Sequence, residues 1–331
     1  MKTNTLTKIF KFTFCLVICT LGLGLSASAE DPTITVFDVP GAGTDPDQGT
    51  FPQGINPTGD IVGFIKDAGV RSGTARRGFV RDKDGTSTVF DAPGAGTDDF
   101  EGTRAYSINP GGAITGWFIE SGGVVHGYVR AKNGTFTVFD AGPPGPYPQG
   151  TFPYGFTMIN PEGAITGYYT DADTVNHGFV RAQGGTITAF DVLGAGMGPF
   201  QGTAPLGINP EGAITGFYAD SGDVSHGFLR DKNGTITSPI DVPGAGTGAF
   251  QGTFPQSITP DSSITGNYVD GSDVNHGFLR DRNGTITTFD VPGAGTDAGQ
   301  GTAPFAIAPD GAITGLYFDY SNVSHGFLRS Q

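Results

Sequence analysis

The stretch that decides the fold runs from His226 to Asp270 and reads HGFLRDKNGTITSPIDVPGAGTGAFQGTFPQSITPDSSITGNYVD. The same pattern occurs six times, at a period of about 50 residues. A Phe/Ile-Asp pair marks each copy and returns at spacings of 53, 49, 51, 50 and 49 residues. The pairs are Phe37-Asp38, Phe90-Asp91, Phe139-Asp140, Phe190-Asp191, Ile240-Asp241 and Phe289-Asp290. Together the copies account for nearly all of residues 31–331.

Each copy contains four short stretches typical of β-strands, separated by residues that form turns. One example of each is found at residues 53–56, 164–169, 226–230 and 285–291. In most copies an Asn-Pro turn follows the first stretch, and an Asn-Gly or Gly-Gly turn separates the third from the fourth. The pattern therefore predicts four antiparallel strands per copy.

Composition agrees with an all-β chain that has a packed core. Of 331 residues, 56 are Gly and 23 are Pro, and no run free of both exceeds 10 residues after residue 30. Because Gly and Pro break helices, helical structure is nearly excluded. The chain is 37% hydrophobic and has 26 Phe and 10 Tyr, which is enough for a core and argues against disorder.

Four antiparallel strands repeated six times predict a six-bladed β-propeller of four-stranded blades. The alternative is a β-solenoid, whose coils are usually shorter and which needs end caps that the sequence lacks. The chain begins with a spare fourth strand, Thr33 to Val39, and ends on a third strand, His325 to Arg329. We expect these two segments to pair and close the ring, which would remove both exposed edges.

Residues 1–29 have the features of a signal peptide, and residues 30–331 form the single predicted domain. Lys2, Lys8 and Lys11 are followed by an apolar run from Phe12 to Leu25 and by the small-residue site Ala27-Ser28-Ala29. Cleavage is expected before Glu30, although an uncleaved membrane anchor is the alternative. We expect secretion to the extracellular space or the periplasm. Both cysteines, Cys15 and Cys19, would leave with this segment, so no disulfide is expected.

The charge of the mature chain limits its partners. Removing the three signal lysines leaves 15 basic against 32 acidic residues, a net charge of −17. Such a surface repels nucleic acids and anionic lipid, so we expect neither as a partner. Cations and uncharged ligands such as glycans remain compatible with it. A monomer is expected.

The repeat resembles a known bacterial family. The run Ile-Asn-x-x-Gly-x-Ile-x-Gly followed by His-Gly-Phe-Leu is similar to the HAF repeats, which are named for a His-Ala-Phe signature and occur in extracellular proteins. The resemblance extends over all six copies, but glycine stands where the family has alanine, at Gly127, Gly178, Gly227, Gly277 and Gly326. It implies a secreted bacterial repeat protein and no defined activity.

The five histidines all fall at one position of the repeat. Counting across the hairpin between the third and fourth strands places each histidine opposite the aspartate of the Phe-Asp pair. The expected structural pairs are His126–Asp140, His177–Asp191, His276–Asp290 and, across the ring closure, His325–Asp38. Copy one has Arg77 opposite Asp91, while Pro239 breaks the count in copy five. A metal or catalytic role is the less favoured alternative, because equivalent positions are spread around a ring.

Two further positions are charged in all six copies. The third strand ends on Arg81, Arg130, Arg181, Arg230, Arg280 and Arg329. Acidic residues follow the second strand at Asp67, Glu120, Asp171, Asp220, Asp270 and Asp319. We expect inter-strand salt bridges or turn caps. The alternative is a ring of acidic loops that binds Ca²⁺ weakly; no other cofactor or metal is expected.

Function should lie where the copies differ. Copy one has a basic loop with Arg71 and Arg76, copy two has the single tryptophan, and copy three has a Pro-rich loop and an insertion. Aromatic and arginine side chains together are typical of sugar-binding surfaces. The predicted ligand-binding residues are Arg71, Arg76, Arg104, Tyr106, Trp117, Tyr147 and Tyr154. Ordinary loop variation is the alternative.

These observations favour a secreted, non-enzymatic binding or scaffold module for a glycan or a protein. The alternative is an extracellular propeller enzyme, a polysaccharide lyase or hydrolase, with its site at the mouth of the central channel. The predicted innermost strand offers mostly Gly, Ile, Asn, Ser and Gln, and the histidines are symmetric, so no catalytic residue is assigned.

Overall fold

A computed structural model describes residues 35–44, 48–66, 75–155 and 157–330. The chain divides into two units, Met1–Phe37 and Asp38–Gln331, and the fold described below is that of the second. It contains 23 strands, and the described residues include no helix, hence none that could span a membrane. The predicted signal peptide lies outside the described residues.

Each copy contributes strands in the same order. The first strands are β1 (Gly49–Ile55), β5 (Gly102–Ile108), β9 (Gly150–Phe152), β13 (Gly202–Ile208), β17 (Gly252–Ile258) and β21 (Gly301–Ile307). The second strands are β2 (Ile61–Lys66), β6 (Ile114–Ile119), β10 (Ile165–Thr170), β14 (Ile214–Ala219), β18 (Ile264–Val269) and β22 (Ile313–Phe318). The third strands are β3 (Arg76–Arg81), β7 (Val125–Arg130), β11 (Asn176–Arg181), β15 (Ser225–Arg230), β19 (Asn275–Arg280) and β23 (Ser324–Arg329). The fourth strands are β4 (Ser87–Phe90), β8 (Phe136–Phe139), β12 (Ile187–Phe190), β16 (Ile236–Ile240) and β20 (Ile286–Phe289).

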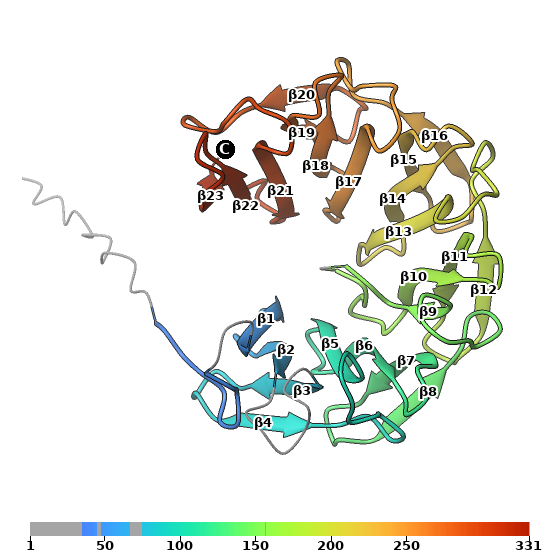
Figure 1. Ribbon diagram of the computed structural model, residues 1–331, viewed down its shortest axis with the longest axis vertical. Coiled ribbons are helices and arrows are strands. Elements are labelled where there is room, and N and C mark those ends of the chain that lie inside the picture. The colour runs from blue at the N-terminus through green and yellow to red at the C-terminus, as the bar shows by residue number, and fades with distance from the viewer. Residues whose placement is uncertain (1–34, 45–47, 67–74, 156, 331) are drawn as a thin grey trace, which may run out of the picture. The chain divides into compact units, whose positions relative to one another are not determined.

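Within a copy, consecutive strands pair antiparallel, as β13 with β14, β14 with β15, and β15 with β16. The copies of this unit follow one another around a central hollow, with the first strands facing the hollow and the fourth strands outermost (Figure 1). This is the architecture of a β-propeller, and the all-β prediction is confirmed.

Adjacent copies meet at a glycine that begins the first strand. Gly202 bridges Asn176 of the preceding copy in a parallel contact, with a φ of +103°. A Cβ on Gly202 would lie 2.0 Å from the Asn176 carbonyl oxygen. The next residue, Thr203, is fully buried and its Oγ1 accepts a hydrogen bond from the Val192 N–H (2.9 Å). The Gly-Thr pair that recurs at the start of the first strands therefore forms the joint between copies.

The core lies at the contacts between successive copies. Ile214 and Phe228 are fully buried and pack in one cluster with Val192, Ile208 and Tyr218. The arginines that end the third strands cover the outer part of this contact. Four of them lie over the Phe of the Phe-Asp pair of the preceding copy, at 4.7–5.0 Å from the ring centroid: Arg130, Arg181, Arg230 and Arg329. The predicted salt bridges at these four arginines are therefore replaced by cation–π contacts, because the nearest partner is an aromatic ring.

Buried asparagines link the turns after the first strands of successive copies. Asn109 Nδ2 donates to the Asn160 carbonyl (3.2 Å), and Asn209 Nδ2 donates to the Thr259 carbonyl (3.0 Å). Longer contacts of 3.5 Å join Asn56 to copy two and Asn160 to copy four. Copies five and six have Thr259 and Ala308 at this position, so the series of amide donors stops at copy four.

The predicted ring closure is not formed. Among the described residues, 35–39 contain no strand and β23 pairs only with β22. Val39 is instead held on copy one, where its N–H donates to Thr50 (3.0 Å), and the outer edge of β3 is occupied by β4. Residues 35–39 thus form no additional strand of copy one, and the closed six-bladed ring is not confirmed. Thr33 lies outside the described residues.

Three exposed phenylalanines before the joint adopt a left-handed backbone. Phe250 has a φ of 65° and is 78% exposed, whereas copy six has Gly299 at this position with a φ of 81°. A left-handed conformation costs a non-glycine residue about 1–2 kcal/mol. We expect Phe250→Gly to raise the free energy of unfolding by about 0.5–1 kcal/mol in urea denaturation, after allowing for glycine's greater entropy loss on folding. Phe250→Ala keeps the strain and should not stabilise; equal stabilisation by both variants would contradict this explanation.

Candidate functional site

A cavity of about 810 Å³ lies where copies one, two and three meet. It gathers five of the seven predicted ligand-binding residues, while Tyr154 lies just beyond it and Arg71 falls outside the described residues. Its walls are formed by Phe64, Arg76, Asp99, Phe100, Glu101, Arg104, Tyr106, Trp117, Ile119, Gly122, Gly123 and Tyr147. We call it the aromatic–arginine cavity.

Arg104 forms the buried floor of the aromatic–arginine cavity. It is 5% exposed and lies on β5 opposite Trp117 of β6, with its guanidinium carbon 4.0 Å from the indole centroid. Its Nη2 donates to the Phe100 carbonyl. Burial, and then the charge of Arg76, lower the pKa of Arg104 to about 9. The group therefore remains a cation at neutral pH.

Arg76, at the start of β3, supplies a second cation. Its guanidinium lies 5.7 Å from the Phe100 ring centroid, and its Nη1 is buried without a hydrogen-bond partner among the described residues. Burial lowers the pKa of Arg76 as well. A buried donor without a partner is costly, and the cavity wall holds two such donors, Arg76 Nη1 and Trp117 Nε1.

Stacked aromatic rings continue from the cavity into copy three. Tyr106 stacks on Trp117 (centroids 6.2 Å apart) and meets Tyr154 edge-on (5.0 Å). Trp117 is buried beneath Arg104, so it supports the wall and does not itself offer a free ring face. Tyr147 is 65% exposed and lies at the border with an adjoining cavity of about 370 Å³. Tyr147 thus offers an exposed ring at the cavity wall.

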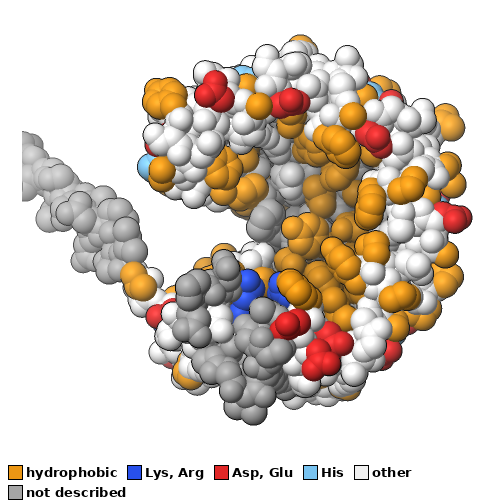
Figure 2. Space-filling view, in the orientation of Figure 1, with side chains coloured by type: hydrophobic (Ala, Val, Ile, Leu, Met, Phe, Trp, Pro, Cys, Tyr) orange, Lys and Arg blue, Asp and Glu red, His pale blue; other side chains and the backbone are white. Residues whose placement is uncertain are grey.

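The central hollow is lined by one residue from each of several first strands. A β-bulge in β1, β5, β13, β17 and β21 turns one extra residue inward. These residues, with Tyr154, surround a space of about 340 Å³ and are Gln53, Tyr106, Leu206, Gln256 and Phe305. Hydrophobic side chains gather on this inner wall, with Lys and Arg at its edge over the first copies (Figure 2). The expected polar lining is therefore corrected, because the bulges place aromatic residues there.

The arginines mark a departure from the repeat. At the position of Arg104 the other copies have Phe51, Phe152, Ala204, Phe254 and Ala303. At the position of Arg76 they have Val125, Asn176, Ser225, Asn275 and Ser324. Sequence reasoning missed Phe64 and Phe100 as cavity residues. Little in the sequence distinguished these two residues, since both positions carry aromatic residues in other copies.

The predicted histidine contacts are present within copies. His126, His177 and His276 each approach the expected aspartate through Nδ1, at 2.9, 3.1 and 2.9 Å. Arg77 pairs with Asp91 (2.9 Å). His325 makes no contact with Asp38 and instead approaches Asp319 (3.4 Å), because the ring closure that would bring Asp38 near is not formed.

The copy that contains Pro239 also forms the contact that the residue count had excluded. His226 lies 2.9 Å from Asp241, although Pro239 adds one residue to the hairpin. A register shift between Gly227 and Leu229 absorbs the extra residue, so the pair survives. The structural role that we assign to these pairs remains a prediction.

The acidic position after the second strand caps the following turn. Asp220 Oδ1 accepts from the N–H groups of Gly222 (2.8 Å) and Val224 (3.0 Å), and its Oδ2 lies 3.5 Å from His226 Nε2. Burial acts in the opposite direction, but these N–H groups and His226 lower the pKa of Asp220. The predicted turn caps are present at Asp171, Asp220, Asp270 and Asp319, whereas Glu120 lies 3.6 Å from His126 Nε2 and Asp67 is outside the described residues. In the described part of the chain no group of three or more His, Cys, Asp or Glu side chains could hold a metal ion.

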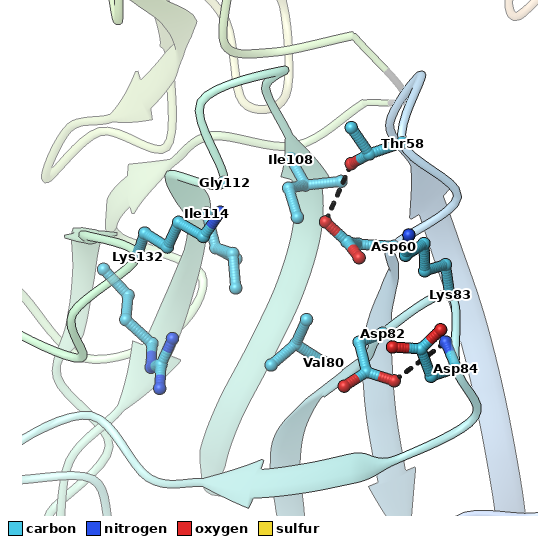
Figure 3. A pocket seen from close by; sticks show the side chains of 11 residues that line it. Thr58, Asp60, Val80, Asp82, Lys83, Asp84, Ile108, Gly112, Ile114 and Lys132 are labelled. Carbon is cyan, nitrogen blue, oxygen red and sulfur yellow. Dashed lines mark hydrogen bonds between the residues drawn. The ribbon is translucent and has the colours of Figure 1, made fainter.

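A second cavity of about 610 Å³ lies between the hairpin ends of copies one and two, where Lys132 lies across from Asp82 and Asp84 (Figure 3). Asp60 on its wall accepts hydrogen bonds from Asn56 (3.0 Å) and Thr58 (2.9 Å). Asp82 accepts from backbone N–H groups of its own turn. These carboxylates are engaged within their turns, so the aromatic–arginine cavity is the stronger candidate.

Comparison with known proteins finds similarity to solved structures. No protein-family model and no curated protein matches the chain. The fold is similar to that of a subtype N11 neuraminidase-like protein of A/flat-faced bat/Peru/033/2010, with 10% sequence identity and a TM-score of 0.42. The match covers 90% of this chain and 91% of that one.

Proposed function

We propose that the protein is a secreted, non-enzymatic binding module that holds a glycan in the aromatic–arginine cavity. The observation that carries the proposal is the gathering, in one cavity, of Arg76, Arg104, Tyr106, Trp117 and Tyr147. Each differs from the residues at its position in most other copies, so the repeat architecture does not require it. A cavity of this size, with aromatic walls and a few charged groups, is typical of a small-ligand site.

Secretion is supported by the signal-peptide features of residues 1–29 and by the resemblance of the repeat to the HAF family. The acidic surface of the mature chain fits an extracellular protein whose ligand enters one localised basic site. Weakly bound Ca²⁺ stays a separate prediction. Loss of melting temperature in EDTA would support it, since an ion bound only by the native state stabilises that state.

Glycan binding should depend on the exposed ring of Tyr147. We expect Tyr147→Ala to weaken binding of the glycan selected on an array by about tenfold, because an interface aromatic contributes more than about 1 kcal/mol. Isothermal titration calorimetry on the mature chain measures the effect. Tyr320→Ala is the matched control, since Tyr320 is 71% exposed in copy six, far along the chain from this site.

The array also tests the proposal as a whole. Absence of binding to every glycan would refute it, as would equal losses in the Tyr147 and Tyr320 variants. The enzyme alternative predicts a different result. A lyase or hydrolase would convert the bound polysaccharide into shorter fragments, which chromatography of the incubated mixture would reveal.

A further inference from the structure

The two arginines of the aromatic–arginine cavity share an enclosed space without a carboxylate partner. Among the described residues, neither Arg76 nor Arg104 forms an ion pair, and Arg76 Nη1 has no hydrogen-bond partner. The charge on Arg76 is close enough to lower the pKa of Arg104. Two like charges held together in a partly desolvated cavity repel each other. No carboxylate among the described residues therefore pairs with either of the two arginines.

The acidic residues at the rim do not supply that charge. The Glu101 carboxylate is held by backbone donors, since it accepts from the Asp98 N–H (3.0 Å) and the Gly122 N–H (3.3 Å). Asp99 is exposed at the mouth of the cavity. Neither carboxylate contributes to the shifted pKa of Arg76 or Arg104, so the arginines are not neutralised from this side.

Other arginines of the chain illustrate the contacts made by an arginine that only stabilises the fold. Arg77, next to Arg76 on β3, pairs with Asp91. Arg130 and Arg230 lie over phenylalanine rings of the preceding copy at 4.7 and 4.9 Å. Arg76 has no carboxylate partner like that of Arg77, and its guanidinium lies 5.7 Å from the Phe100 ring centroid, farther than these two; a buried nitrogen without a hydrogen-bond partner is shared with Arg130.

We propose that the aromatic–arginine cavity binds the anionic group of an acidic glycan, a carboxylate or a sulfate ester, between Arg76 and Arg104. The inference rests on the proposed glycan-binding function and specifies the class of glycan. Arginine offers donors in a planar fork that matches carboxylate and sulfate oxygens. The exposed ring of Tyr147 borders the same cavity and would contact the sugar ring beside the anion.

The test compares matched pairs of oligosaccharides. One pair is trigalacturonate and its methyl ester; the other is a sulfated carrageenan tetrasaccharide and its desulfated form. We expect at least one acidic member to bind about tenfold more tightly than its neutral counterpart at low salt, since a lost charge-assisted contact is worth about 1.4 kcal/mol or more. The two pairs distinguish a carboxylate from a sulfate ester. Raising the salt concentration should weaken the acidic ligand alone.

Variants of the two arginines complete the test. Arg76→Gln and Arg104→Gln should each remove the preference for the acidic member, whereas the control Arg77→Gln should keep it. Arg76→Gln should also leave the melting temperature of the unliganded protein unchanged or raise it, because it relieves the repulsion between the guanidinium groups. A merely structural arginine would instead lower the melting temperature when replaced.

The outcomes separate this inference from the proposed function. Equal binding of acidic and neutral members, or an unaltered preference in both glutamine variants, would overturn the anion site while glycan binding stands. Binding of no member of these pairs, and of no glycan on the array, would refute the proposed function itself. Loss of stability in Arg76→Gln in parallel with loss of binding would assign Arg76 a structural role and overturn the inference.

Discussion

Replacing Gly202 by alanine is expected to lower the free energy of unfolding by about 3–5 kcal/mol, or to prevent folding. Two effects add. The φ of +103° at Gly202 is strained for any residue with a side chain, and the new Cβ would lie 2.0 Å from the Asn176 carbonyl oxygen. That oxygen belongs to the backbone, so it cannot move without opening the joint between copies three and four.

Urea denaturation followed by circular dichroism measures this effect. Gly271→Ala is the matched control, because Gly271 is exposed and a Cβ there would meet nothing within 4 Å. The control should change stability by less than about 0.5 kcal/mol. A Gly202→Ala protein as stable as the control would show that the joint adapts, and would contradict the rigid packing described here.

Replacing Asn209 by alanine is expected to lower the free energy of unfolding by about 2–3 kcal/mol. Asn209 is 1% exposed; its Oδ1 accepts from the Ala213 N–H (2.8 Å) and its Nδ2 donates to the Thr259 carbonyl (3.0 Å). The alanine variant leaves both backbone groups without these partners in a buried setting. It also removes the link from copy four to copy five.

Thermal and urea unfolding of Asn209→Ala should be compared with those of Asn233→Ala. Asn233 lies exposed in a hairpin turn, and its side chain makes no hydrogen bond within the described part of the chain. A loss no larger than in this control would show that water replaces the Asn209 contacts without cost.

Local chemistry made most of the fold predictable from the sequence. Turn residues at fixed offsets predicted the strand order, and the constant length of the hairpin between the third and fourth strands predicted the histidine–aspartate contacts. His226 shows the limit of such counting, because a bulge compensates for the residue added by Pro239. The predicted ring closure is not formed. Two terminal segments that could complete one blade need not lie close together in the folded chain, and the sequence does not specify their distance. Val39 is bound to copy one, and residues 35–37 are not part of a strand.

The candidate site was predictable as a set of residues and not as a cavity. Departures from the repeat pointed to Arg76, Arg104 and Tyr147, yet they lie in three different copies. Their meeting depends on how copies pack side by side, which the sequence does not specify. For the same reason the sequence could not show that Trp117 is covered by Arg104.

The series of buried asparagines, which ends at Asn209, divides the chain into unequal parts. Copies one to four are each fastened to the next by an asparagine amide, whereas copy six is held to copy five by the joint, by apolar and cation–π contacts, and by a hydrogen bond of 3.4 Å from the Ile307 N–H to Ser257 Oγ. In a linear array whose stability is a sum of nearest-neighbour couplings, the weakest coupling sets where cooperativity breaks. Copy six can therefore fray as a separate cooperative unit while the copies that form the cavity stay intact. Damage in copy six would then leave the proposed ligand site in place.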